Sequence, residues 1–131
     1  MAELSEARIA HLGMIQAVIT RMAGESARMK QFALATLGAL AATSEATGSA
    51  ALAWVACALA FVFWLLDAQY LAQERWYRRL YDRVRGGEGP TDFAMTPDAE
   101  TRGAETVART AFGWSVAPLY GVLLILSLIL A

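Results

Sequence analysis

The 131-residue chain has one cysteine, one histidine and three prolines. A single cysteine, Cys57, excludes a disulfide within the chain, and one histidine leaves no Cys/His spacing for a zinc site. The glycine-rich stretch at 86–90 lacks the Lys-Ser or Lys-Thr of a phosphate-binding loop. The acidic residues are scattered and show no paired-carboxylate pattern. The sequence therefore predicts no catalytic residue, no metal site and no cofactor, and we expect His11 to be a packed or surface residue.

Charge is missing from three stretches, residues 31–44, 46–66 and 110–131, in a chain that is 57% hydrophobic. About 20 apolar residues cross a bilayer, so the second and third stretches are long enough. The first crosses only with its polar ends included or with local thinning of the bilayer. We predict an all-α integral membrane protein with spans at roughly 30–46, 48–68 and 111–131.

The basic residues occupy only two segments, one before the first span and one between the second and third spans. The hairpin between the first two spans carries only Glu45. Cytoplasmic loops are rich in Lys and Arg, so both basic segments are expected inside. This predicts a multi-pass membrane protein with a cytoplasmic N-terminus and a C-terminus at the outer face, which is the periplasmic face in a bacterial inner membrane. The segment before the first span lacks the apolar core of a cleavable signal peptide.

The chain divides into four predicted regions: a cytoplasmic amphipathic helix (1–29), a transmembrane hairpin (30–68), a cytoplasmic basic helix extension with a loop (69–110), and the third span (111–131). Helical spacing of apolar residues from Leu4 onward indicates a helix over 3–23, capped by Ser5 and ended or bent at Gly24. The second helix is uninterrupted from after Gly48 to Arg85, so it projects beyond the membrane.

The segment after the second helix is predicted as a loop over 86–100. A short helix starting near Pro97 is expected to run directly into the third span. Pro118 is expected to kink that span, and Trp114 and Tyr120 are expected to anchor it at the interface.

Small residues recur at helical spacing in the first span. Two interpretations remain open for them: alanine-rich packing against the second span, or a face for oligomer contacts or a pore. The residues are Ala35, Gly38, Ala39, Ala42 and Thr43.

Asp67 lies where the apolar stretch of the second helix ends. An ionisable group at that depth is costly, so it is expected to have a partner or to line a wet cavity. One interpretation is a salt bridge with Lys30 or Arg28; the other is a gating or conducting role. Glu74, two turns further on, is the second carboxylate to which these two interpretations apply.

The helix beyond Asp67 interleaves arginines with aromatic residues. Guanidinium groups suit phosphates, and aromatic rings can stack on bases. The alternative is a membrane anchor that follows the positive-inside pattern. The candidate phosphate contacts are Arg75, Arg78, Arg79 and Arg83, with Arg21, Arg28 and Lys30 from the first helix; the candidate stacking residues are Trp76, Tyr77 and Tyr81.

Two motifs, "VITRMAGESARMK" (18–30) and "FWLLDAQYLAQERWYRRLYD" (within 61–82), resemble small three-span bacterial membrane effectors of anti-phage systems, in particular the channel effectors of Hailong systems. The resemblance covers about residues 10–85. It implies a channel that depolarises the inner membrane and is held closed by short single-stranded DNA made by a partner nucleotidyltransferase. The matching positions are Arg21, Ser26, Lys30, Asp67, Tyr70, Glu74, Arg78, Tyr81 and Asp82.

Three short spans cannot enclose a pore, so a channel requires a homo-oligomer, of which a cyclic tetramer is the expected example. Two alternatives remain: a holin-like pore former, and a non-conducting membrane anchor for a partner enzyme. The C-terminus "LLILSLILA" lacks the charged tail that many holins carry.

Overall fold

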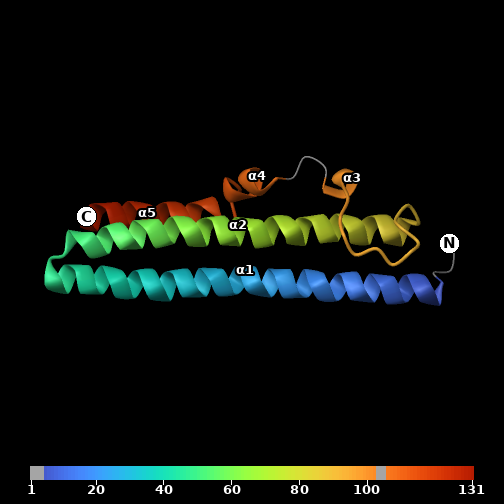
Figure 1. Cartoon of the computed structure of the whole chain (residues 1–131), viewed down its shortest axis with the longest axis horizontal. Coiled ribbons are helices and arrows are strands. Elements are labelled where there is room, and N and C mark those ends of the chain that lie inside the picture. The colour runs from blue at the N-terminus through green and yellow to red at the C-terminus, as the bar shows by residue number, and fades with distance from the viewer. Residues whose placement is uncertain (1–4, 103–105) are drawn as a thin grey trace.

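A computed structural model describes residues 5–102 and 106–131, and their regular structure is α-helical. Two long helices, α1 (Glu6–Thr47) and α2 (Ala50–Gly86), run antiparallel along each other and form a rod (Figure 1). At 1.5 Å per residue they are about 63 and 55 Å long. Three shorter helices follow: α3 (Ala99–Arg102), α4 (Val107–Ala111) and α5 (Ala117–Leu130). The predicted all-α class is confirmed.

The ends of the long helices carry the expected caps. Ser5 Oγ accepts a hydrogen bond from the backbone N–H of Arg8, so the predicted cap of the first helix is present. Gly48 ends α1 in the left-handed conformation, with φ of 65°, which a residue without a side chain adopts at little cost. Gly87 does the same after α2, with φ of 82°. A short turn, Gly48 and Ser49, therefore joins the long helices.

The rod has two separate cores. Near the turn, alanines let the backbones of α1 and α2 approach closely, and α5 packs against them. This core contains Ala33, Leu37, Ala56, Ala60, Val116 and Tyr120. At the other end, larger side chains fill the space between α1 and α2: Leu12, Ile15, Ile19, Leu80 and Val84. We call the second part, residues 6–29 of α1 and 67–86 of α2, the stalk.

Gly24 neither ends nor bends the first helix, contrary to the prediction. The amphipathic helix and the first predicted span are one helix, α1. A glycine inside a helix costs only about 1 kcal/mol relative to alanine. Packing of α1 against α2 on both sides of Gly24 outweighs that cost. Leu4 and the rest of residues 1–4 lie outside the described residues.

The predicted helix from Pro97 into the third span is also wrong. The described parts of this region form the separate helices α3 and α4, and residues 112–116 interrupt the chain before α5; residues 103–105 lie outside the described part. Pro118 does not kink a span. It sits in the first turn of α5, where its missing N–H costs no helical hydrogen bond.

Tyr120 is fully buried rather than interfacial. Of the two interpretations of the small residues in α1, packing on α2 is not observed, because these residues are exposed: Ala35, Gly38, Ala39, Ala42 and Thr43.

Within the described residues, α2 is the one helix that is both long and apolar enough to cross a membrane. Helix α5 is apolar but has only 14 residues. The first predicted span is the C-terminal part of α1 and does not stand out as a separate apolar helix. By length and composition, the described part of the fold thus has one candidate span.

Gly24 offers a test of the continuous α1 helix. A Cβ added there meets no atom within 4 Å. Gly24→Ala should therefore stabilise the protein by about 0.5–1 kcal/mol, since it removes the entropy cost of glycine in a helix. Thermal unfolding of the detergent-solubilised chain, followed by circular dichroism at the helical band, measures this change. Gly48→Ala is the matched control and should destabilise, because the turn needs a positive φ. Destabilisation by Gly24→Ala would mean that α1 is broken at this position.

Candidate functional site

Asp67 is the centre of a buried polar cluster between α1 and α2. Its side chain is fully buried, and Lys30 Nζ lies 2.6 Å from Asp67 Oδ2. Ser26 Oγ donates a hydrogen bond to Asp67 Oδ1, and Lys30 Nζ donates to Ser26 Oγ at 3.0 Å. Ser26 and Lys30 are one helical turn apart, so one face of α1 presents both to the carboxylate. The expected salt bridge is present, and its partner is Lys30.

Arg28, the other basic residue considered for Asp67, points elsewhere. Its Nη1 lies 3.0 Å from Glu25 Oε1, in a pair on the surface of α1. Exposed pairs of this kind contribute at most about 1 kcal/mol. Arg21 is exposed on the same helix and also lies outside the cluster.

Tyr120 brings α5 to the same cluster. Its hydroxyl is buried, and Asp67 is the charged group that acts on it electrostatically. Val116, one turn earlier, is equally buried, so both residues face the alanine core. Sequence reasoning missed this role of Tyr120. The available signal was the one-turn spacing between Val116 and Tyr120, which sets the buried face of α5.

The cluster lies where the exposed apolar surface of the rod ends. Leu65 and Leu66, directly before Asp67, are exposed. Exposed large apolar side chains are concentrated in two stretches, 32–66 and 112–129, with Ile9, Met14 and Phe93 outside them. The stretches contain Phe32, Leu34, Trp54, Val55, Phe61, Val62, Leu65, Leu66, Phe112, Trp114, Val122, Ile125, Leu126, Leu128 and Ile129.

Aromatic residues on the surface of the rod lie near the same end of the apolar surface. Trp64 Nε1 donates to the Ala111 carbonyl at 2.8 Å, and its ring meets Phe112 edge-on at 5.5 Å. Trp114 is 88% exposed on the segment that joins α4 to α5. This segment, beside the middle of α2 in Figure 1, attaches α5 to the hairpin next to Asp67.

Glu74 has its own partner on α2. Although Glu74 is buried, Arg78 lies one turn further along α2, and Arg78 Nε donates to Glu74 Oε1 at 2.6 Å. This local pair neutralises the carboxylate without a partner from α1. Of the two carboxylates considered for gating, Asp67 alone joins different helices.

Arg79 and Arg83 of the basic extension face the segment that contains α3. Arg83 Nη1 lies 3.2 Å from Asp98 Oδ1 and donates to Thr101 Oγ1 at 2.6 Å. Arg79 donates to the carbonyl oxygen of Arg102. Arg75, one turn before Arg79, also has an interaction partner. The acid paired with Arg83 is thus Asp98 of the same chain, which sequence reasoning did not name.

The three candidate stacking residues separate onto two faces. Tyr77 and Tyr81 pack against the stalk core, partly buried, so their rings serve packing first. Tyr81 and Arg78 also line a cavity of about 240 Å³ beside α1. Trp76 lies on the α3 side, where the Arg102 guanidinium is 5.1 Å from its ring centroid. The predicted ligand-contact residues therefore do not form one continuous surface.

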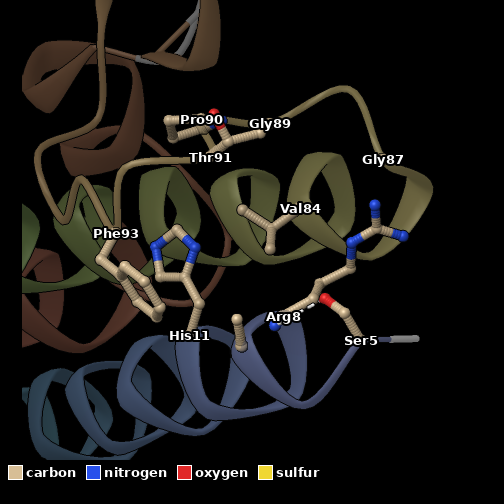
Figure 2. A pocket seen from close by; sticks show the side chains of 10 residues that line it. Ser5, Arg8, His11, Val84, Gly87, Gly89, Pro90, Thr91 and Phe93 are labelled. Carbon is tan, nitrogen blue, oxygen red and sulfur yellow. Dashed lines mark hydrogen bonds between the residues drawn. The ribbon is translucent and has the colours of Figure 1, made fainter.

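His11 has a packing role at the tip of the stalk (Figure 2). It is buried, its Nε2 lies 3.0 Å from the Ala94 carbonyl oxygen, and its ring is tilted against Phe93 at 5.5 Å. Arg8, Val84 and the loop after α2 complete a cavity of about 110 Å³ at this point. His11 thereby fastens the loop before α3 to α1.

Contacts with Thr101 and Arg83 perturb the acidity of Asp98. The Thr101 hydroxyl and then the Thr101 backbone N–H donate to its carboxylate, and these bonds, with the charge of Arg83, hold the pKa of Asp98 below its ordinary value of 3.8. Asp98 is exposed, so this describes local attachment and not overall stability.

No protein-family model, curated protein or solved structure matches this chain.

Replacing one partner of the Lys30–Asp67 pair should destabilise the fold more than replacing both partners together. Lys30→Met leaves the buried Asp67 carboxylate without its partner and should lower the free energy of unfolding by about 3 kcal/mol or more. Asp67→Asn leaves the partly exposed Lys30 ammonium unpaired and should cost less. The double variant should recover most of that loss. Unfolding in mixed micelles, followed by circular dichroism, gives the double-mutant cycle. Glu25→Gln, at the exposed pair with Arg28, is the control and should cost less than about 1 kcal/mol. Additive single effects would contradict a direct pair.

The attachment of α3 should depend on pH through Asp98. A depressed folded-state pKa means that the attachment is fully favoured above pH 3.8 and is lost as pH falls through the folded pKa. The carboxyl carbon shift of Asp98, measured by NMR, should titrate with a midpoint below 3.8. Arg83→Gln should raise that midpoint. An unchanged midpoint in Arg83→Gln would show that Arg83 does not act on Asp98.

Proposed function

We propose that this protein is an oligomeric inner-membrane channel that acts as an anti-phage effector and is controlled from the cytoplasm by a nucleotide or oligonucleotide. In this proposal three segments cross the membrane: the C-terminal part of α1, the N-terminal part of α2, and α5 with the segment before it. The observation that carries the proposal is the apolar surface of the rod, which covers this half and stops at Asp67.

This surface is what a bilayer solvates and water does not. Soluble monomers rarely expose large contiguous apolar patches, yet exposed apolar side chains here come from all three helices. Residues 31–47 of α1 and 50–66 of α2 each span about 26 Å, close to the hydrocarbon thickness of about 30 Å. Helix α5, with 14 residues, spans about 21 Å, so local thinning of the bilayer or the preceding segment supplies the remainder.

The charges of the stalk fit a cytoplasmic location. Arg75, Arg78, Arg79, Arg83 and Arg85 lie on α2 beyond Asp67, whereas the turn at the other end of the rod carries only Glu45 nearby. This distribution follows the positive-inside pattern. The Lys30–Asp67 pair then lies at the inner boundary of the membrane.

Several copies are needed for conduction. Alanines fill the interior of the membrane half, so a water-filled path fits between copies rather than within one. The exposed small residues of α1 allow a second helix to approach closely, which is how helices associate in lipid. A closed ring such as a tetramer places the stalks around a common axis, where their arginines raise the local concentration of anions.

The anti-phage role and the class of ligand rest on the resemblance of the two motifs to Hailong effectors. Phosphate neutralisation by Arg and Lys dominates the affinity of such ligands.

A non-conducting membrane anchor is the second candidate. It is favoured by the internal pairing of the stalk, since Arg78, Arg79 and Arg83 already have partners within the chain. In that case the stalk is a rigid post to which a partner enzyme binds.

Membrane potential separates these functions. Induction of the protein alone should depolarise cells within minutes, as measured with a voltage-sensitive dye. Asp67→Ala should abolish the effect at equal membrane abundance, because it leaves Lys30 unpaired at the junction of the helices. Glu45→Gln, on the exposed turn side, should depolarise like the parent chain. The purified protein in planar bilayers should carry current that short single-stranded DNA changes. Current unaffected by any nucleotide favours a holin-like pore, and absence of current in cells and bilayers favours the anchor.

A further inference from the structure

Residues 97–102 form a short segment that covers the arginine face of α2, and we call this segment the cover. Its oxygen atoms accept hydrogen bonds from Arg79 and Arg83. Asp98 and Thr101 accept from Arg83, and the carbonyl of Arg102 accepts from Arg79. Carboxylate, hydroxyl and carbonyl oxygens therefore occupy guanidinium groups that lie one turn apart on α2.

The cover is held together by its own bonds. The backbone N–H of Thr101 donates to Asp98 Oδ1 at 2.7 Å, and Arg102 Nε donates to the Pro97 carbonyl at 3.1 Å. These bonds do not involve α2, so they persist when the cover leaves the arginines. Release breaks the contacts of Asp98 and Thr101 to Arg83, the bond from Arg79 to the Arg102 carbonyl, and the stacking of Arg102 on Trp76.

The contact between Asp98 and Arg83 is weaker than a guanidinium can provide. A single nitrogen, Arg83 Nη1, faces both carboxylate oxygens, at 3.2 and 3.5 Å. Strong guanidinium pairs instead use two parallel N–H groups on two oxygens. The Asp98 side chain is also 61% exposed, and exposed pairs contribute little. A phosphate that accepts two parallel N–H bonds from the guanidinium can therefore bind Arg83 more tightly than the Asp98 carboxylate does.

We propose that Arg79 and Arg83 form a phosphate-binding site that the cover occupies in the absence of ligand, and that a nucleotide or oligonucleotide phosphate displaces Asp98 from Arg83. This inference rests on the proposed ligand class and adds the site and its internal competitor. When the cover leaves, Arg102 leaves the face of Trp76, and that ring becomes a surface on which a base can stack.

Distance decides the source of the phosphate. Arg83 lies more than four helical turns beyond Asp67 on the same helix, which places it about 24 Å from the inner boundary of the membrane. The Debye length at physiological ionic strength is about 8 Å. Headgroup phosphates are therefore out of reach, and the ligand is a soluble phosphate ester.

Binding of a short fluorescein-labelled oligothymidylate and of ADP to the full chain in nanodiscs tests the proposal. Asp98→Asn removes the competitor and should tighten binding about fivefold, the upper range for an exposed pair. Asp82→Asn is the matched control, because Asp82 is 66% exposed and forms a 3.7 Å pair with Arg85. It removes the same charge but should change affinity less than twofold. Trypsin cleavage after Arg102 should be faster in ligand-free Asp98→Asn, and the ligand should accelerate it in the parent chain.

The possible results distinguish a failure of this inference from a failure of the proposed function. If the parent chain binds phosphate esters and both variants tighten equally, the charge acts through the general field and the cover is not a competitor. If binding appears only in phosphatidylglycerol nanodiscs and not in phosphatidylcholine nanodiscs, the binding depends on the anionic lipid and the inference is wrong. If no variant binds any phosphate ester, both the inference and the proposed ligand fail, while the depolarisation assay judges the channel independently.

Discussion

The arrangement of the rod depends on one constraint: the Asp67 carboxylate is fully buried and must keep its positive partner. A buried charge without a partner costs several kcal/mol, more than most sliding or rotation of α1 against α2 can offset. Lys30 lies as far before the end of α1 at Thr47 as Asp67 lies after the start of α2 at Ala50. The short turn and the ion pair therefore specify the same register, and a shift by one helical turn would separate the pair.

Asp67 also lies at the junction between the stalk and the other half of the rod, whose exposed surface is apolar. On one side of Asp67 the helices are separated by alanines and coated with exposed apolar side chains; on the other, larger side chains fill the core and arginines cover the outside. Tyr120 packs α5 into the alanine core beside this junction, so the three helices α1, α2 and α5 meet there.

Much of the fold was predictable because it is local. The extent of α2, the loop after it and the Ser5 cap follow from charge gaps, glycines and capping residues, and Lys30 was one of two partners expected for Asp67. The continuity of α1 was not predictable, because the cost of Gly24 is small beside packing that only the paired helix supplies. Asp98 was missed because an irregular loop separates it from Arg83, and such a loop fixes no geometry in the sequence. Tyr120 was placed at the interface from residue type alone, whereas its burial depends on how α5 docks.

The unbroken passage of α1 and α2 through the boundary at Asp67 has a mechanical consequence. Paired helices without a hinge behave as a stiff beam, and Asp67 divides α2 into arms that are about 26 and 29 Å long. If the rod pivots at the polar junction, a sideways displacement of the stalk tip therefore produces a displacement of nearly equal size and opposite direction at the other end of α2. The two arms are nearly equal, so a small movement at the stalk tip reaches the turn at Gly48 with little change in amplitude.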